Sequence, residues 1–212
     1  MPKNNKELEC RAYSFEIRAE ESETDAIITG RPIVYNRVAN LEHFNEVIES
    51  GALDGANLTD VRFLVNHDRT RIPLARSRRN NGNSTMQMSV DMQGLNLDWV
   101  RLDVKNNAEA RALFSAVQRG DITGMSFLFS VDKEEWENLE SEHPTRHILK
   151  IGTVVEVSAV TFPAYEATEI FARSKEALDN ARAALDSARQ QSASTQSVDT
   201  ELNLLKEKTK IL

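Results

Sequence analysis

The stretch Gly120-Asp-Ile-Thr-Gly-Met-Ser-Phe-Leu-Phe-Ser130 decides the fold, because a helical pattern ends here and a strand pattern begins. Thr123-Gly124 breaks the helical pattern, and Met125 to Val131 then alternate as a short strand does. Ser126 lies at the start of that strand, directly after a glycine. This position suits a nucleophile, since a residue without Cβ lets a substrate backbone approach and leaves amides free for an oxyanion. An ordinary structural serine is the alternative, because nothing nearby matches Gly-x-Ser-x-Gly.

Alternating patterns on both sides of this stretch predict a mostly β protein with a few helices. The predicted strands are Cys10 to Arg18, Ala26 to Tyr35, Asp60 to His67, Thr85 to Asp91, Gly94 to Val104 and His147 to Thr161, with the first two forming an opening hairpin. Helical spacing predicts helices over Leu41 to Ser50, capped by Gly51, and over Asn107 to Gln118. The polar segment Asp132 to Arg146 is predicted to be a surface excursion.

Composition excludes several classes of protein. The 212 residues carry a net charge of -7, which argues against a general nucleic-acid binder. The single cysteine, Cys10, forms neither a disulfide framework nor a Cys-x-x-Cys pair, and it favours an intracellular compartment. The four histidines show no metal-ligand spacing, so we expect no metal and no cofactor. No apolar run reaches the length of a membrane span, and we expect no membrane partner.

The composition changes from Ser174 onward. The residues from there to Leu212 include no Gly, Pro or aromatic residue, and basic and acidic side chains balance. Leu178, Ala181, Leu185 and Ala188 keep a heptad-like spacing, and the polar segment Gln190 to Ser197 is predicted to be a linker. Two interpretations stay open: a helix that docks on a partner, or a partly disordered extension.

Three side chains have the chemistry of a hydrolase triad. His67 ends the apolar face formed by Val61, Phe63 and Val65, Ser126 begins a strand, and Glu156 is an acid between two valines. In such a triad the base takes the serine proton, and the acid fixes and stabilises the imidazolium. These residue types alone are weak evidence, and a histidine that ends an apolar face is often structural.

Six segments in a fixed order add a more specific signal. They are Gly30 to Tyr35, Glu46 to Leu53, Phe63 to Asp68 (Leu-x-Asn-His-Asp), Gly94-Leu95, Gly120 to Phe127 (Gly-x-x-x-Gly-Met-Ser-Phe) and Glu156 to Ala164 (Glu-Val-Ser-x-Val-Thr-x-Pro-Ala). Together they resemble the prohead maturation proteases of tailed bacteriophages, a family distantly similar to the herpesvirus assemblins. The resemblance spans roughly Cys10 to Ala172.

The resemblance implies a role for each matching residue. Ser126 would be the nucleophile and His67 the general base, with Glu156 orienting the imidazole. Asp68 is the alternative acid, because it follows the base directly, although it reaches the ring only if the chain turns there. The arginine pair that supports the assemblin oxyanion has no match after Glu156. The oxyanion donors would then be the backbone of Gly124 and Met125, or an arginine between residues 69 and 79.

The resemblance also implies a fold, a function and partners. The fold is expected to be α+β, a mostly antiparallel β-barrel flanked by helices, with a C-terminal helical tail. The resemblance places the protease domain at residues 10–173. From the composition we expect residues 1–9 to be flexible and residues 174–212 to be a tail that binds scaffold or capsid subunits or is removed. The implied activity is serine endoproteolysis inside the assembling prohead in the host cytoplasm. Its substrates would be the scaffolding segment of the major capsid protein and the protease itself. The competing interpretation is a non-catalytic assembly factor with a protease-like domain.

Overall fold

The computed structural model describes residues 8–13, 17–21, 26–41, 43–161 and 182–194. Within these ranges the strands are β1 (Leu8–Tyr13), β2 (Ile17–Glu21), β3 (Ala26–Val34), β4 (Val38–Asn40), β5 (Asn45–Ile48), β6 (Arg62–Val65), β7 (Ala75–Arg76), β8 (Met86–Asp91), β9 (Gly94–Leu102), β10 (Gly124–Glu137) and β11 (Thr145–Val160). The helices are α1 (Ala108–Gln118), a short 3₁₀ turn (Arg78–Asn80) and a helix over residues 182–194.

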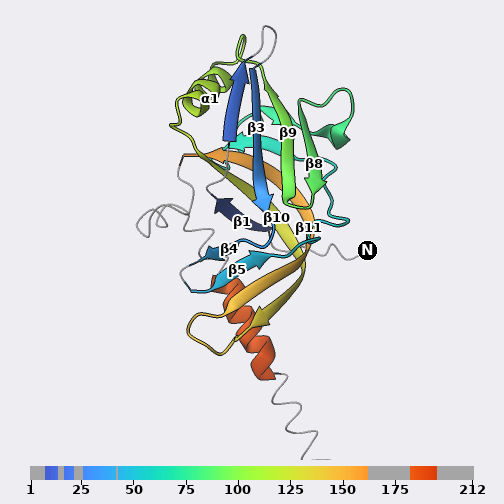
Figure 1. Cartoon of the computed structure of the whole chain (residues 1–212), viewed down its shortest axis with the longest axis vertical. Coiled ribbons are helices and arrows are strands. Elements are labelled where there is room, and N and C mark those ends of the chain that lie inside the picture. The colour runs from blue at the N-terminus through green and yellow to red at the C-terminus, as the bar shows by residue number, and fades with distance from the viewer. Residues whose placement is uncertain (1–7, 14–16, 22–25, 42, 162–181, 195–212) are drawn as a thin grey trace, which may run out of the picture.

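The smaller sheet has the strand order β2-β3-β9-β8, and α1 lies beside it (Figure 1). Asn107 caps the helix by accepting bonds from the amides of Glu109 and Ala110, at 2.9 and 3.2 Å. The helix places Ala110, Leu113, Phe114 and Val117 in the core. Where β9 meets β3, a Cβ on Gly94 would lie 2.0 Å from the carbonyl oxygen of Ile33, so only glycine fits there.

The larger sheet is organised around β11. Its strand order is β1-β10-β11-β5-β4, with β6 also paired to β11 and β7 paired to β6. The long hairpin of β10 and β11 is antiparallel, whereas β5 and β6 run parallel to the two ends of β11. One buried cluster joins the two sheets and includes Ile33, Leu97, Phe127 and Val157. β11 therefore links the core to β5 at its N-terminal end and to β6 near its C-terminal end.

The predicted helix over Leu41 to Ser50 is wrong. The segment instead contains β5, which pairs with β4 on one side and with β11 on the other. The apolar spacing was misleading because β5 is buried on both faces: Glu46, Val47 and Ile48 are consecutive buried residues. Gly51, predicted as the helix cap, instead lies in the turn after β5 with φ of 83°.

Two other predicted segments also differ from the structure. The stretch Cys10 to Arg18 divides between β1, which pairs with β10, and β2, which pairs with β3. The segment Asp132 to Arg146 is largely a continuation of the β10–β11 hairpin, since Lys133 to Glu137 pair with Lys150 to Thr145. Its polar composition reflects alternating solvent exposure along a hairpin. The helix predicted over Asn107 to Gln118 is confirmed, and Gly120, with φ of 74°, follows it.

The α+β class is confirmed, but the barrel has to be corrected. The described strands form two open sheets, and neither closes on itself: the larger sheet ends at β1, β4 and β7, and the smaller one at β2 and β8. No helix in the described part of the chain is both long and apolar enough to cross a membrane.

Part of the C-terminal tail docks on the larger sheet. The helix over residues 182–194 lies against the far end of the β10–β11 hairpin (Figure 1). Leu185 is buried with Leu41 and Phe44, and Arg189 donates to the carbonyl oxygens of Leu139 and Ser141 at 3.2 and 2.8 Å. Residues 190–194 belong to this helix, so the predicted linker begins too early. Leu178 and Ala181 lie outside the described residues.

Candidate active site

Four adjacent strands bring the predicted site residues into one row. Leu64 of β6 pairs with Ser158 of β11, Ser158 pairs with Ser126 of β10, and Ser126 pairs with Ala12 of β1. Glu156 lies two residues before Ser158 and therefore on the same face of β11. Ser126, Ser158 and Glu156 are all buried. The sheet register therefore gathers residues that are far apart in the sequence.

The turn after β6 carries His67 back over this row. Asn66 and His67 both have left-handed backbone conformations, with φ of 50° and 58°. Such conformations are unusual for residues other than glycine and are concentrated at functional sites. The amide of Asn66 donates to the carbonyl oxygen of Ala159 at 2.9 Å, and its side-chain oxygen accepts from the amide of Thr161 at 3.0 Å. The turn is therefore fixed to the end of β11.

The imidazole of His67 lies between a hydroxyl and a carboxylate. Its Nε2 is 2.5 Å from Oγ of Ser126, and its Nδ1 is hydrogen-bonded to Oε1 of Glu156. Ser158 supports both neighbours: its Oγ donates to Oε2 of Glu156 at 2.7 Å and accepts from the amide of His67 at 3.2 Å. The structure therefore brings the predicted base and the predicted nucleophile into contact.

A His67 ring protonated at both nitrogens satisfies the hydrogen bonds around it. The single hydroxyl proton of Ser126 is donated to the carbonyl oxygen of Arg11 at 2.7 Å, so Nε2 must donate in its bond to Ser126. The groups around the ring also favour its protonated form. Burial lowers the pKa of His67, but hydrogen bonds with Cys10 and Glu156, together with electrostatic attraction to both, outweigh it and raise the pKa to about 10.

β1 covers the serine. Ser126 is fully buried, and Sγ of Cys10 lies 3.1 Å from Nε2 of His67 and 3.5 Å from Oγ of Ser126. The His67 side chain keeps 27% of its surface exposed. The site thus reaches solvent on the histidine side and is closed by the N-terminal strand on the serine side.

The alternative acid, Asp68, has other partners. Its carboxylate accepts from the amide and hydroxyl of Thr70 at 3.0 and 2.5 Å and lies 3.4 Å from Arg71. The hydrogen bonds with Thr70 and the attraction of Arg71 lower the pKa of Asp68. Gly124 and Met125 are buried at the start of β10, where they pair with Val160 and Ala159.

Three of the five arginines considered for the oxyanion have partners outside the site. Arg76 pairs with Asp60 at 2.5 Å, Arg78 donates to the carbonyl oxygen of Asn83 at 2.6 Å, and Arg71 pairs with Asp68. Among the described residues, no group of three or more histidine, cysteine or acidic side chains is arranged to hold a metal ion.

Sequence reasoning missed two neighbours of the histidine. Ser158 lies within the quoted Glu-Val-Ser segment and on the face of Glu156, so its spacing could have identified it as a partner of the carboxylate. Cys10 had no such signal. It approaches His67 only because β1 pairs with β10, and the sequence pattern instead indicated a hairpin with the next strand.

Comparison with known proteins identifies the family. Searches of the curated proteins and of the solved structures each gave no significant match. The likeness to assemblins therefore stays an expectation. A family model for the caudovirus prohead serine proteases matches residues 13–182, most of the chain. With a histidine–serine contact at the centre of the matched region, the chain belongs to the caudovirus prohead serine protease family.

Proposed function

We propose that this protein is the serine endopeptidase that cleaves the scaffolding segment of the major capsid protein during prohead assembly. The observation that carries the proposal is the 2.5 Å contact between Nε2 of His67 and Oγ of Ser126, within a chain of the prohead protease family. A base within hydrogen-bond reach of a hydroxyl is the geometry that nucleophilic catalysis needs.

The reaction follows the acyl-enzyme route. Neutral His67 takes the Ser126 proton as Oγ attacks the scissile carbonyl carbon, and then gives that proton to the leaving amine. Water, activated by the same imidazole, hydrolyses the ester and restores the serine. The Glu156 carboxylate accepts the hydrogen bond from Nδ1–H of His67 and stabilises the imidazolium. The hydrogen bond from Ser158 keeps this carboxylate in place.

The backbone amides near Gly124 and Met125 are the proposed oxyanion donors. These residues directly precede Ser126 in the chain, and the arginines with described partners point elsewhere. Preformed amide donors stabilise the negative charge that develops on the carbonyl oxygen.

The proposed domain organisation follows the sequence prediction with one change. Residues 10–173 form the protease domain, but β1 already begins at Leu8. In the tail, the helix over residues 182–194 would contact scaffold or capsid subunits, since it is held by one small apolar cluster that includes Leu185. The protein would act within the assembling prohead, and cleavage of its own chain belongs to the same proposal.

Co-expression with the major capsid protein tests the proposed function. Wild-type protein should yield capsid protein without its scaffolding segment, and Ser126→Ala should leave it whole, as measured by intact-protein mass spectrometry. Ser115→Ala, which changes a serine on α1, is the matched control and should cleave normally. Capsid cleavage that persists with Ser126→Ala would reject the proposal and leave the chain as a non-catalytic assembly factor.

A further inference from the structure

β1 is the strand that lies directly beside the candidate nucleophile. It pairs antiparallel with β10 beside Ser126, and the carbonyl oxygen of Arg11 is 2.7 Å from Oγ of Ser126. Because a carbonyl bond is about 1.23 Å long, the carbonyl carbon lies within about 3.9 Å of that Oγ. Reacting atoms in a near-attack arrangement are about 3–3.5 Å apart, so a small shift would place this carbon for attack.

Alternation along β1 separates two faces. Cys10 faces the serine and histidine, whereas Glu9 and Arg11 face the opposite side and are buried. Arg11 binds Glu46 through two bonds, from Nε at 2.5 Å and from Nη2 at 2.7 Å. A bidentate pair between fully buried groups recognises a guanidinium by its geometry as well as its charge.

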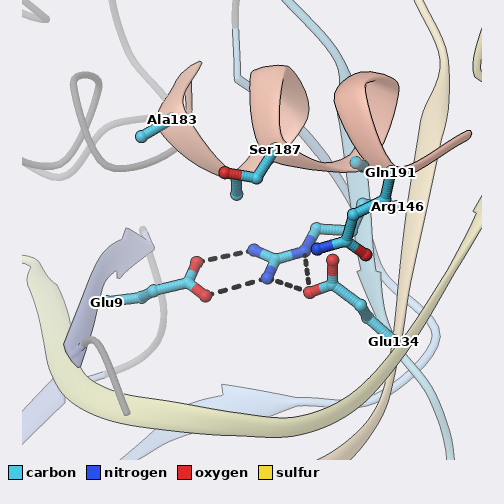
Figure 2. A pocket seen from close by; sticks show the side chains of 8 residues that line it. Glu9, Glu134, Arg146, Ala183, Ser187 and Gln191 are labelled. Carbon is cyan, nitrogen blue, oxygen red and sulfur yellow. Dashed lines mark hydrogen bonds and ion pairs between the residues drawn. The ribbon is translucent and has the colours of Figure 1, made fainter. Parts of the chain in front are cut away.

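Arg146 provides the matching contact for Glu9. Its Nη1 and Nη2 bind the two carboxylate oxygens of Glu9 at 2.5 and 2.8 Å, and its guanidinium also binds Glu134 (Figure 2). Nη1 is in addition 3.0 Å from Oε2 of Glu46. A pocket of about 170 Å³ adjoins this cluster, between Glu9 and the helix over residues 182–194. The acidic residue of β1 is thus held by a cation from β11.

The departure of β1 does not change the net charge of the buried cluster, which has one acid more than bases both before and after. Glu9 and Arg11 contribute one charge of each sign, so their departure leaves the net charge of the remaining Glu46, Glu134 and Arg146 unchanged. Arg146 stays paired with both remaining acids, while Glu46 loses its bidentate partner. The remaining site is therefore complementary to an incoming strand that carries an acid and a base two residues apart.

We propose that β1 occupies the place of a substrate strand along β10, with Glu46 as the subsite for a basic residue before the cleaved bond and Arg146 as the subsite for an acid two positions earlier, an inference that rests on the proposed proteolysis. The substrate is thus an extended peptide with the pattern acid-x-base, and the first such peptide is the chain itself, cut between Arg11 and Ala12.

The step balances without a cofactor. Oγ of Ser126 attacks the Arg11 carbonyl carbon, and His67 takes the hydroxyl proton and passes it to the Ala12 nitrogen as the carbon–nitrogen bond breaks. Water then hydrolyses the Arg11 ester, which leaves a carboxylate at Arg11 and an amine at Ala12. Because the ring is protonated while Cys10 and Glu156 face it, cleavage is faster at pH 9 than at pH 7.

The test follows the full chain at pH 7 and pH 9 by mass spectrometry. The wild type should release a fragment that ends at Arg11 and leave a chain that begins at Ala12, and Ser126→Ala should release neither. A synthetic peptide of residues 3–17, offered to the processed enzyme, should be cut at the same bond. Peptides with Arg11→Gln or Glu9→Gln should be cut at least tenfold more slowly than the parent peptide. The cleavage rate of the Arg11→Lys peptide should fall by a smaller factor.

The outcomes separate the two proposals. If the wild type cleaves capsid protein but leaves the Arg11–Ala12 bond whole in both chain and peptide, the inference fails and the proposed function stands. Equal cleavage of the parent and Arg11→Gln peptides also rejects it, and peptides avoid any effect of that change on folding. Capsid cleavage by Ser126→Ala rejects the proposed function and the inference with it.

Discussion

At the scale of single residues, the site depends on how one imidazole is surrounded. His67 contacts a hydroxyl through Nε2 and a carboxylate through Nδ1, and a thiol lies beside the hydroxyl. The carboxylate and the thiol raise its pKa, so the ring is protonated near neutral pH while β1 is in place. A base must be neutral to accept a proton, and the covered state is therefore a resting state.

Removing the thiol should lower the pKa of His67. In Ser126→Ala protein, which cannot cleave itself, the further change Cys10→Ala removes a hydrogen bond that favours the imidazolium. NMR titration of the His67 ring should therefore show a lower midpoint with alanine at position 10. An unchanged or higher midpoint would mean that Cys10 does not act on the ring.

Changing each candidate acid to its amide should distinguish Glu156 from Asp68 as the third member of the triad. Glu156→Gln removes the negative charge beside Nδ1 and should reduce kcat by about 10²–10⁴-fold, as loss of the third triad member does elsewhere. Asp68→Asn should change kcat less than twofold, because that carboxylate binds Thr70 and Arg71. Capsid cleavage rates measure both. If Asp68→Asn reduced kcat more than Glu156→Gln does, Asp68 and not Glu156 would be the acid of the triad.

At the scale of elements, the turn after β6 is the part on which the geometry depends most. Asn66→Ala loses the side-chain bonds to Thr161 and places an alanine at a φ of 50°. Asn66→Gly loses the same bonds but tolerates that conformation. In urea denaturation, the free energy of unfolding of the Asn66→Ala protein should be about 1 kcal/mol lower than that of the Asn66→Gly protein. Equal stabilities would show that this backbone conformation carries no strain.

The sequence predicted strands well where one face is buried and the other is not. It located Ser126 at the start of β10 and Glu156 on β11, because both strands alternate clearly there. It failed for β5, which is buried on both faces, and for β1, whose partner lies more than a hundred residues away. Alternation reports which face is buried and carries no information about which strand is the neighbour.

At the scale of the whole molecule, a buried ionic cluster connects the N-terminal strand to three other strands of the larger sheet, β5, β10 and β11. Glu9 and Arg11 come from β1, Glu46 from β5, Glu134 from β10 and Arg146 from β11. Burial raises the pKa of Glu9, but the bonds and attraction of Arg146 and Arg11 outweigh it and leave that pKa lowered. The stability from Glu9 is therefore present above its ordinary pKa of 4.5 and is lost as the pH falls through the lowered value.

Breaking this cluster should be costly. Glu46→Ala leaves Arg11 with one acid and should reduce the free energy of unfolding by about 3–5 kcal/mol, as loss of one member of a buried pair does. Glu135→Gln, which removes an exposed partner of Lys133, should cost less than 1 kcal/mol. Urea denaturation at pH 7 compares them. Similar small losses would show that the cluster does not anchor β1.

The central claim is that His67 and Ser126 act as one unit, and a double-mutant cycle tests it directly. The rate of scaffolding-segment cleavage is measured for the wild type, Ser126→Ala, His67→Ala and the double variant. Each single change should reduce kcat by about 10⁴-fold or more, and the double variant should be no slower than the singles. Modest single losses that multiply in the double variant would contradict the account.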